Sequence, residues 1–281
     1  MSSTLKLPNP TWFVGCGNMG GAILDGWRAG GLDLSPLTII RPSGKLVDGV
    51  RTVSNARDAA PGPELAILAF KPQKLGEIAA ELQRFLTAET VVVSLLAGVE
   101  VATLRKLFPA VRDVVRATPN LAVAVRRGVT GLYTDHELRA RQQINDLFVA
   151  LGFAMWMTDE QKLGALGSVA GAGPAYVARF IAALAKAGVE SGLSEDIAST
   201  LALETVLGTA WMAATRAESM DSIARRVASP KGTTEAGLAV LDHNHVLDKL
   251  VAVTIEAASR RGAELAEEAK AGLLAEEPRL S

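Results

Sequence analysis

Residues 11–27 read TWFVGCGNMGGAILDGW, a short apolar run that breaks into glycines and continues as a helical pattern. Gly15, Gly17 and Gly20 have the spacing GxGxxG, which is typical of dinucleotide-binding loops. In such a loop the first glycine allows a tight turn, the second lets the backbone approach a pyrophosphate, and the third lets helix and strand pack closely. The free amides at the start of the helix face the phosphates. The stretch therefore predicts a nucleotide cofactor site.

The composition is that of an ordinary globular protein. The chain has 281 residues, of which 49% are hydrophobic and 21% charged, and this length is enough for two domains. The formal net charge is -1 and basic residues form no run, which argues against a nucleic-acid partner. Continuous apolar stretches of membrane-spanning length and a signal-peptide pattern are both missing, so we expect a cytoplasmic protein without a membrane partner. Cys16 is the single cysteine and forms no internal disulfide.

The hydrophobic pattern changes near Thr158. Before it, short apolar runs alternate with helical stretches, at residues 12–14, 37–40, 65–70, 91–95, 113–116, 130–133 and 154–157. This alternation predicts an α/β fold, a Rossmann-like doubly wound sheet. After it, long helical patterns follow at residues 174–192, 194–215, 219–228 and 246–269. We therefore expect a dinucleotide-binding domain over residues 1–158 and an all-helical domain over residues 159–281.

The helical half has more apolar surface than a small domain can bury. Its first two long helices are rich in alanine and apolar around most of their circumference. A helix buried within its own monomer is the alternative. The excess favours a subunit interface and hence an oligomer.

The end of the second strand distinguishes NADP from NAD. An acidic residue there would bind the ribose hydroxyls of NAD, whereas this strand runs into Arg41, Pro42, Ser43, Gly44 and Lys45. A guanidinium, a hydroxyl and an ammonium group suit a 2′-phosphate. NADPH is the expected cofactor, with NADH or a merely solvated basic turn as the alternatives.

Other strand ends are expected to complete the nucleotide site, because ligands of open parallel sheets bind outside the carboxyl ends of the strands. Lys71 and Pro72 follow one strand, and Ala97 and Gly98 follow the next. Asn55 follows a short apolar run and is expected on the adenosine side.

A second glycine-containing segment, VASPKGTTEAGL, occupies residues 227–238. A helix N-terminus with free amides, two hydroxyls and a lysine forms a carboxylate pocket. Alternatively, Thr233 and Thr234 are only good N-cap residues of an ordinary helix. Spacing alone does not separate these interpretations.

A family resemblance does separate them. The segments GCGNMGGAI, AFKPQ, VVSLLAGV, RATPN, GAGPAYV and VASPKGTTEAGL, in this order, resemble the pyrroline-5-carboxylate reductase family over residues 11–265. The resemblance implies NADPH-dependent reduction of 1-pyrroline-5-carboxylate to L-proline, the last step of proline biosynthesis. It also implies that the helical domain forms an intertwined homodimer, which can assemble into larger rings, with the active site between the first domain and the partner subunit.

The same resemblance assigns roles to individual residues. Gly15, Asn18 and Met19 are assigned to the pyrophosphate, and Asn55, Lys71, Pro72, Ala97 and Gly98 to the rest of the cofactor. The substrate carboxylate is assigned to Ser229, Lys231, Gly232, Thr233 and Thr234. The Thr234 hydroxyl is expected near the ring nitrogen, which makes it the candidate catalytic group.

Three positions depart from the family pattern. Ala172 stands where the family usually has serine, Lys231 where it has glycine, and Thr118 where it has methionine. If position 231 needs a positive backbone φ, a lysine there is strained by about 1–3 kcal/mol, and its charge is available to hold the carboxylate.

Hydride transfer to a protonated cyclic imine needs orientation of the ring and no strong general acid. In agreement, His136, His243 and His245 lie outside every motif. His243 and His245 have no third metal-ligating residue at a suitable spacing, so we do not expect a metal site there. A β-hydroxyacid dehydrogenase is a weaker alternative, because Val177 stands where its catalytic lysine is expected. Two further alternatives are a reductase of another cyclic imine and a non-catalytic NADPH sensor.

Overall fold

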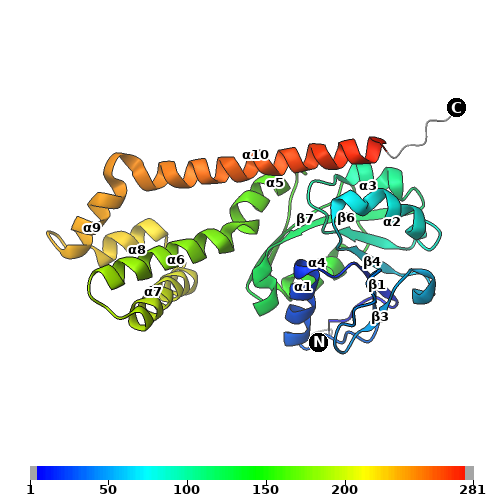
Figure 1. The fold of residues 1–281 in the computed structure, drawn as a ribbon, viewed down its shortest axis with the longest axis horizontal. Coiled ribbons are helices and arrows are strands. Elements are labelled where there is room, and N and C mark those ends of the chain that lie inside the picture. The colour runs from blue at the N-terminus through cyan, green and yellow to red at the C-terminus, as the bar shows by residue number, and fades with distance from the viewer. Residues whose placement is uncertain (1–4, 276–281) are drawn as a thin grey trace. The chain divides into compact units, whose positions relative to one another are not determined.

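An eight-stranded sheet is the centre of the first unit of the chain in the computed structural model, which describes the backbone of residues 5–275 (Figure 1). The strand order is β3-β2-β1-β4-β5-β6-β7-β8. The strands are β1 (Thr11–Val14), β2 (Leu37–Ile40), β3 (Arg51–Val53), β4 (Leu65–Leu68), β5 (Val91–Ser94), β6 (Asp113–Pro119), β7 (Gly128–Tyr133) and β8 (Gly152–Trp156). All neighbours from β3 to β6 are parallel. The predicted doubly wound order is therefore confirmed, with its reversal at β1.

Helices cover both faces of this sheet. Trp12 and Phe13 are neighbours on β1 and lie in different apolar clusters, because successive side chains of a strand point to opposite faces. Helix α1 (Asn18–Ala29) and helix α4 (Arg141–Val149) pack on the Phe13 face, where the indole N–H of Trp27 donates to the carbonyl of Leu147 at 2.8 Å. Helix α2 (Leu75–Leu82) and helix α3 (Val101–Leu107) pack on the Trp12 face.

The sheet differs from the expected pattern at two places. Strand β3 is not anticipated by the sequence, because its three residues are short of a recognisable period and none is fully buried. Strand β7 runs antiparallel to β6, although β7 and β8 are again parallel to each other. The reversal follows from a short turn, Leu121–Val125, in place of a crossover helix.

The second unit, residues 173–257, consists of helices joined by short loops. It comprises α6 (Gly173–Glu190), α7 (Glu195–Arg216), α8 (Met220–Val227), α9 (Thr233–Asp242) and the first part of α10 (Val246–Ala275). Helix α5 (Lys162–Leu166) and the π-helical turn Gly167–Gly171 precede it and belong to the first unit.

The compact units do not divide the chain at Thr158. The first unit extends to Ala172 and takes up the chain again from Ala258. Two contacts within this unit explain the difference. A Cβ atom on Gly131 of β7 would lie 2.8 Å from Leu163 of α5, and the hydroxyl groups of Ser168 and Ser259 are hydrogen-bonded at 2.9 Å. The division into domains 1–158 and 159–281 stays a prediction about function.

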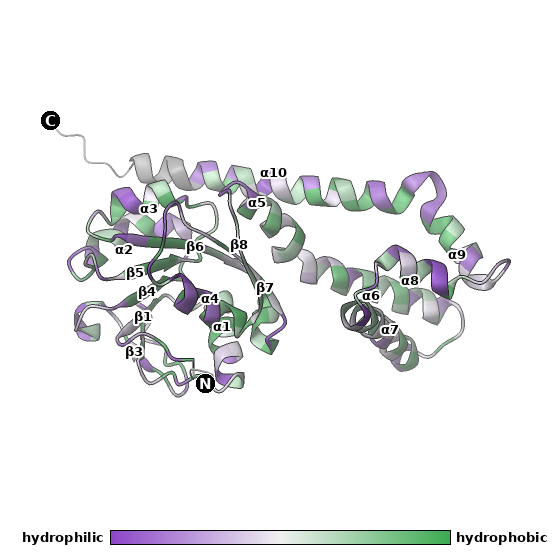
Figure 2. Cartoon of the chain, turned by 180° about the vertical axis from the view of Figure 1, so that it is seen from behind, coloured by the Kyte–Doolittle hydropathy of each residue, from purple (hydrophilic) through white to green (hydrophobic). Residues whose placement is uncertain are grey.

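The helices of the second unit leave large apolar side chains uncovered, including Phe180 and Leu207, which are 51% and 56% exposed. Hydrophobic residues recur along α6 and α7 in the hydropathy colouring of Figure 2. The segments Lys162–Glu190 and Glu195–Arg216 each contain an 18-residue window with a mean hydropathy of 1.3, and each is long and apolar enough to cross a membrane by length and composition alone. Neither segment is an uninterrupted apolar run, because alanine, glycine and single polar residues interrupt both.

Candidate functional site

The first glycine loop is fixed between two strands. Gly15 has φ +81°, and a Cβ atom on it would lie 2.5 Å from the carbonyl oxygen of Ala69. Its N–H donates to Ile40 at the end of β2 at 2.8 Å, and the N–H of Ala69 donates to Val14 at 2.8 Å. Glycine is therefore required here by both conformation and space, as the sequence predicts.

The other two glycines differ in what surrounds them. A Cβ atom on Gly20 would lie 3.0 Å from the Phe13 ring, so this glycine lets α1 pack closely on β1. A Cβ atom on Gly17 would meet nothing within 4 Å, so no packing contact requires this glycine. Gly17 is the N-cap of α1 and no side chain caps the helix. Free amides beside open backbone fit a phosphate group.

The neighbours of these glycines have distinct surroundings. Asn18 is exposed at the first position of α1, whereas the Met19 side chain packs against the core and leaves its backbone as the group available to a ligand. The Cys16 side chain is half-buried, and this burial raises the pKa of its thiol, with Arg41 acting in the opposite direction. A raised pKa disfavours the reactive thiolate, in line with a structural role for Cys16.

Arg41 and Ser43 share one turn at the end of β2. The N–H of Arg41 donates to Val53 of β3 at 3.0 Å, and the turn is closed by a 3.0 Å bond from Gly44 to Arg41. Within the described side chains Arg41 forms no ion pair, so its guanidinium remains available to an anion. The Ser43 hydroxyl accepts the N–H of Lys45 at 3.4 Å.

Two further strand ends lie at the same edge as Gly15. The N–H of Leu95 donates to Leu68 at 2.9 Å, which aligns the end of β5 with the end of β4. Lys71 and Ala97 are exposed beyond these strands. Gly98 has φ +76°, and a Cβ atom on it would lie 2.7 Å from the Cα of Ala266 in α10. Close packing against α10 therefore requires a glycine at position 98, and the sequence alone did not indicate this contact.

The Asn55 side chain is engaged locally. Its carbonyl oxygen accepts the N–H of Asp58 at 3.1 Å, and its amide donates to the Asp58 carboxylate at 2.6 Å. It borders an open cavity of about 570 Å³ that is also lined by Arg57, Asp58, Ala80, Glu81 and Arg84. Asn55 is therefore bonded to Asp58 of the turn Arg57–Ala59 and also borders this cavity.

The second loop, in the helical unit, is a tight turn before α9. The N–H of Gly232 donates to the Ser229 carbonyl at 2.9 Å, and a Cβ atom on Gly232 would collide with the Ser229 hydroxyl oxygen. Lys231 has φ +59°, so the condition under which a lysine at this position is strained is met. Its N–H donates to the Glu235 carboxylate at 2.6 Å, which holds the strained residue in place.

The alternative that Thr233 and Thr234 are ordinary N-cap residues is wrong. The N-cap of α9 is Gly232, and no side-chain hydrogen bond caps the helix. Thr233 is the first residue of the helix, and Thr234 follows it, half-buried. Their hydroxyls and the first helical amides thus form a polar cluster without a capping partner, which suits a carboxylate.

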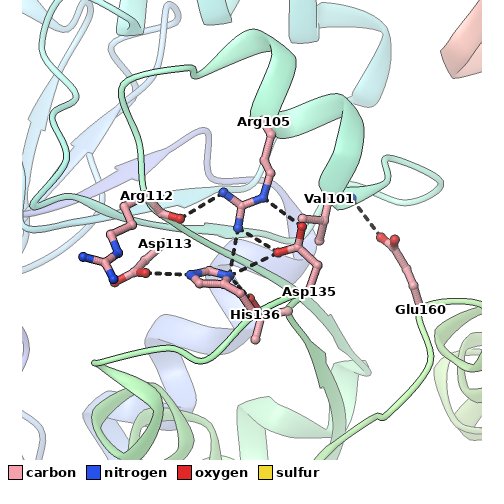
Figure 3. A network of polar contacts seen from close by, with 8 residues as sticks. Val101, Arg105, Arg112, Asp113, Asp135, His136 and Glu160 are labelled. Atoms are coloured by element: carbon pink, nitrogen blue, oxygen red, sulfur yellow. Dashed lines mark hydrogen bonds and ion pairs between the residues drawn. The ribbon is translucent and has the colours of Figure 1, made fainter.

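A polar network that no motif predicted lies at α3 (Figure 3). Arg105 donates to both carboxylate oxygens of Asp135 at 2.7 and 2.9 Å and contacts the Nδ1 atom of His136 at 2.8 Å. The Nε2 atom of His136 lies 2.9 Å from the Asp113 carboxylate. Across the described residues no group of three metal-ligating side chains gathers. The network has no sequence period, because its members come from three separate segments.

The geometry supports two kinds of binding. The first unit has glycine backbone, an uncapped helix and an unpaired guanidinium at one sheet edge, which suits a phosphorylated dinucleotide. The second unit has an uncapped helix with two hydroxyls, which suits a small carboxylate.

Comparison with known proteins identifies the family of this chain. Residues 160–265 match the family model for pyrroline-5-carboxylate reductase dimerisation, and residues 12–98 match the model for NADP oxidoreductase, coenzyme F420-dependent. Over 264 residues the chain is 35% identical to a pyrroline-5-carboxylate reductase of Pseudomonas aeruginosa, which covers 91% of the chain and 96% of that protein. A reductase of the same name from Synechocystis is 37% identical and covers 77% of the chain and 80% of that protein.

Solved structures of the same family resemble this chain over most of its length. The pyrroline-5-carboxylate reductase of Coxiella burnetii has a TM-score of 0.83 at 30% identity and covers 92% of the chain and 99% of that protein. The fold is shared with the Plasmodium falciparum pyrroline carboxylate reductase with NADP bound, at a TM-score of 0.83 and 24% identity, over 94% of the chain and 100% of that protein. The chain belongs to the pyrroline-5-carboxylate reductase family.

Proposed function

We propose that this protein reduces 1-pyrroline-5-carboxylate to L-proline with NADPH, the last step of proline biosynthesis. Membership of the family supports the reaction class. The observation that supports this substrate is the loop Ser229–Thr234, where an uncapped helix start with two threonine hydroxyls follows a lysine. This is a carboxylate site that a protein binding NADPH alone does not need.

The residues at the sheet edge fit NADPH. Gly15, Gly17, Asn18 and the Met19 backbone would hold the pyrophosphate, and Arg41 and Ser43 the 2′-phosphate. Asn55, Lys71, Pro72, Ala97 and Gly98 would complete the cofactor site. When bound, NADPH supplies a hydride to the carbon of the C=N bond. NADH is the alternative donor and lacks the group that Arg41 would bind.

The second loop would orient the substrate. The helical amides of α9, Ser229, Gly232 and Thr233 would bind the carboxylate, with the Lys231 ammonium adding charge. The Thr234 hydroxyl would donate a hydrogen bond to the ring nitrogen, which keeps the imine polarised and its carbon electrophilic. Solvent can deliver the proton that this nitrogen gains, so no buried general acid is required.

The apolar helices assemble the protein. The dimerisation model spans both hydrophobic segments, and side chains such as Phe180 and Leu207 would be covered by a second copy and not by lipid. A homodimer is the minimum assembly, and rings of dimers are its extension. We place the enzyme in the cytoplasm, with a small-molecule substrate and without a nucleic-acid or membrane partner.

The reaction is tested by following nicotinamide absorbance with purified protein, NADPH and 1-pyrroline-5-carboxylate. NADH, other cyclic imines and 3-hydroxy acids with NADP are measured in parallel. Rapid oxidation with 1-pyrroline-5-carboxylate and formation of proline support the proposal. Turnover with another imine alone would contradict the assignment of 1-pyrroline-5-carboxylate as the substrate. Turnover of a hydroxy acid would contradict the reaction class. NADPH binding without turnover of any substrate would favour a non-catalytic NADPH sensor.

A further inference from the structure

Glu160 joins three parts of the first unit that are distant in sequence. It lies between β8 and α5, and its Oε1 atom accepts the backbone N–H of Val101 at 2.8 Å (Figure 3). The same oxygen accepts the Nη1 group of Arg116 on β6 at 2.8 Å. No sequence motif contains Glu160.

The bond to Val101 serves the start of α3. The N-cap residue of this helix, Glu100, makes no side-chain cap, so Glu160 supplies the acceptor that the local sequence lacks. A carboxylate at this end also interacts favourably with the helix dipole.

Arg116 holds the Glu160 carboxylate at a fixed place. The two side chains are 13% and 22% exposed, so the pair is largely shielded from water. Arg116 is paired in register with Ser94, the last residue of β5. The ion pair therefore ties the start of α3 to the carboxyl end of the sheet.

The segment between β5 and α3 is consequently held at three points. Leu95 is bonded to Leu68 at its beginning, Gly98 packs on Ala266 in its middle, and Glu160 binds Val101 just beyond its end. This segment contains Ala97 and Gly98, which the proposed function places against the cofactor.

We infer that Glu160 is a positioning residue for NADPH: it fixes the Leu95–Glu100 segment through the start of α3 without touching the cofactor itself. The inference rests on the proposed cofactor site. A loosened segment must be ordered when NADPH binds, and that ordering weakens the affinity.

The other end of α3 offers a matched control. Arg105 and Asp135 form an ion pair there, remote from the Leu95–Glu100 segment along the helix (Figure 3). A substitution of Asp135 breaks a salt bridge to the same helix, but it leaves the bond between Glu160 and Val101, and hence the Leu95–Glu100 segment, in place.

The experiment measures the dissociation constant of NADPH by fluorescence, without substrate, for the wild type, Glu160→Ala, Glu160→Gln and Asp135→Asn. We expect Glu160→Ala to raise this constant about tenfold. Glu160→Gln keeps an oxygen for the Val101 N–H, so its constant should rise only about threefold. Asp135→Asn should stay within about twofold of the wild type. The KM for NADPH should change in parallel.

An unchanged constant for Glu160→Ala, or an equal rise for Asp135→Asn, would overturn the inference. If Glu160→Ala fails to fold, the double variant Arg116→Met with Glu160→Met removes both charges and should still raise the constant about tenfold, because Val101 loses its acceptor. Wild-type protein that binds NADPH but does not reduce 1-pyrroline-5-carboxylate would contradict the proposed function. In that case the NADPH dissociation constants of the variants would still decide whether Glu160 positions the cofactor segment. Wild-type protein that does not bind NADPH overturns both.

Discussion

Lys231 is held in a left-handed conformation by Glu235, whose carboxylate accepts the Lys231 N–H at 2.6 Å. A charged residue that keeps an unfavourable φ in a binding loop indicates a local role for its side chain. Lys231→Gly should raise the free energy of unfolding by about 1 kcal/mol, measured by urea denaturation, because the strain is released.

The charge of Lys231 is tested by a second variant. Lys231→Ala removes the ammonium but keeps the strain, so it should show no gain in stability. Both variants should raise the KM for 1-pyrroline-5-carboxylate about threefold to tenfold if the ammonium holds the carboxylate. A KM that neither variant changes would remove Lys231 from the substrate site.

Arg41→Asp should shift the cofactor preference toward NADH. Without the guanidinium the 2′-phosphate loses a charge-assisted partner, and the KM for NADPH should rise about tenfold or more. The KM for NADH should fall or stay constant, because the new carboxylate can accept from the ribose hydroxyls. Arg112→Asp, an exposed change at the amino end of β6, is the control, and an equal shift there would contradict the assignment.

Thr234→Ala should lower kcat about tenfold while the NADPH dissociation constant is unchanged, because the hydroxyl is assigned to the substrate ring alone. Thr234→Ser keeps a hydroxyl and should retain most of the activity. Steady-state kinetics and fluorescence titration separate the two parameters. Full activity of the alanine variant would leave the protein without a side-chain donor to the imine nitrogen.

Asp135 makes stability depend on pH. The hydrogen bond from Arg105 lowers the pKa of this carboxyl below its ordinary value of 3.8, an effect that burial partly offsets. Because the folded-state pKa is depressed, the ion pair stabilises the fold above about pH 4, and this contribution is lost as the pH falls through the folded-state pKa. Asp135→Asn should lower the free energy of unfolding by about 0.5–1 kcal/mol at pH 7, a small amount because the ion pair is partly solvated. In urea titrations the variant and the wild type should converge in acid, and a constant difference down to pH 2 would refute this account.

Leu207→Glu should dissociate the assembly. Its side chain is 56% exposed on α7, and a carboxylate buried in an apolar subunit interface is strongly unfavourable. Light scattering should report a smaller particle than the wild type. Leu46→Glu, at a residue that is 80% exposed in the first unit, should leave the mass unchanged.

The sequence predicted the elements that depend on local chemistry. Glycines at positions 15 and 20 are required by backbone conformation and close packing, and apolar runs located the central strands. Two local features are harder to predict. Thr233 and Thr234 are residue types that also favour helix caps, although Gly232 is the N-cap of α9, and the short strand β3 has three residues, none fully buried, which is too few to show a period.

Glu160 shows a further limit at the site. Its importance depends on an amide and a guanidinium that lie far from it along the chain, and no spacing rule relates these three positions. Roles in ligand binding follow from recurrent loop patterns, whereas support of a loop depends on the tertiary packing of one particular fold.

The contact between Gly98 and Ala266 bears on how the protein is made. During translation the strands of the sheet are synthesised first, then the helical unit, and only afterwards the part of α10 that contains Ala266. The nucleotide-binding unit therefore remains one helix short until the whole helical unit has been synthesised. Expression of the first half alone should yield a species that lacks the support for Gly98, and C-terminal truncation before Ala258 should weaken NADPH binding although every predicted cofactor residue is retained.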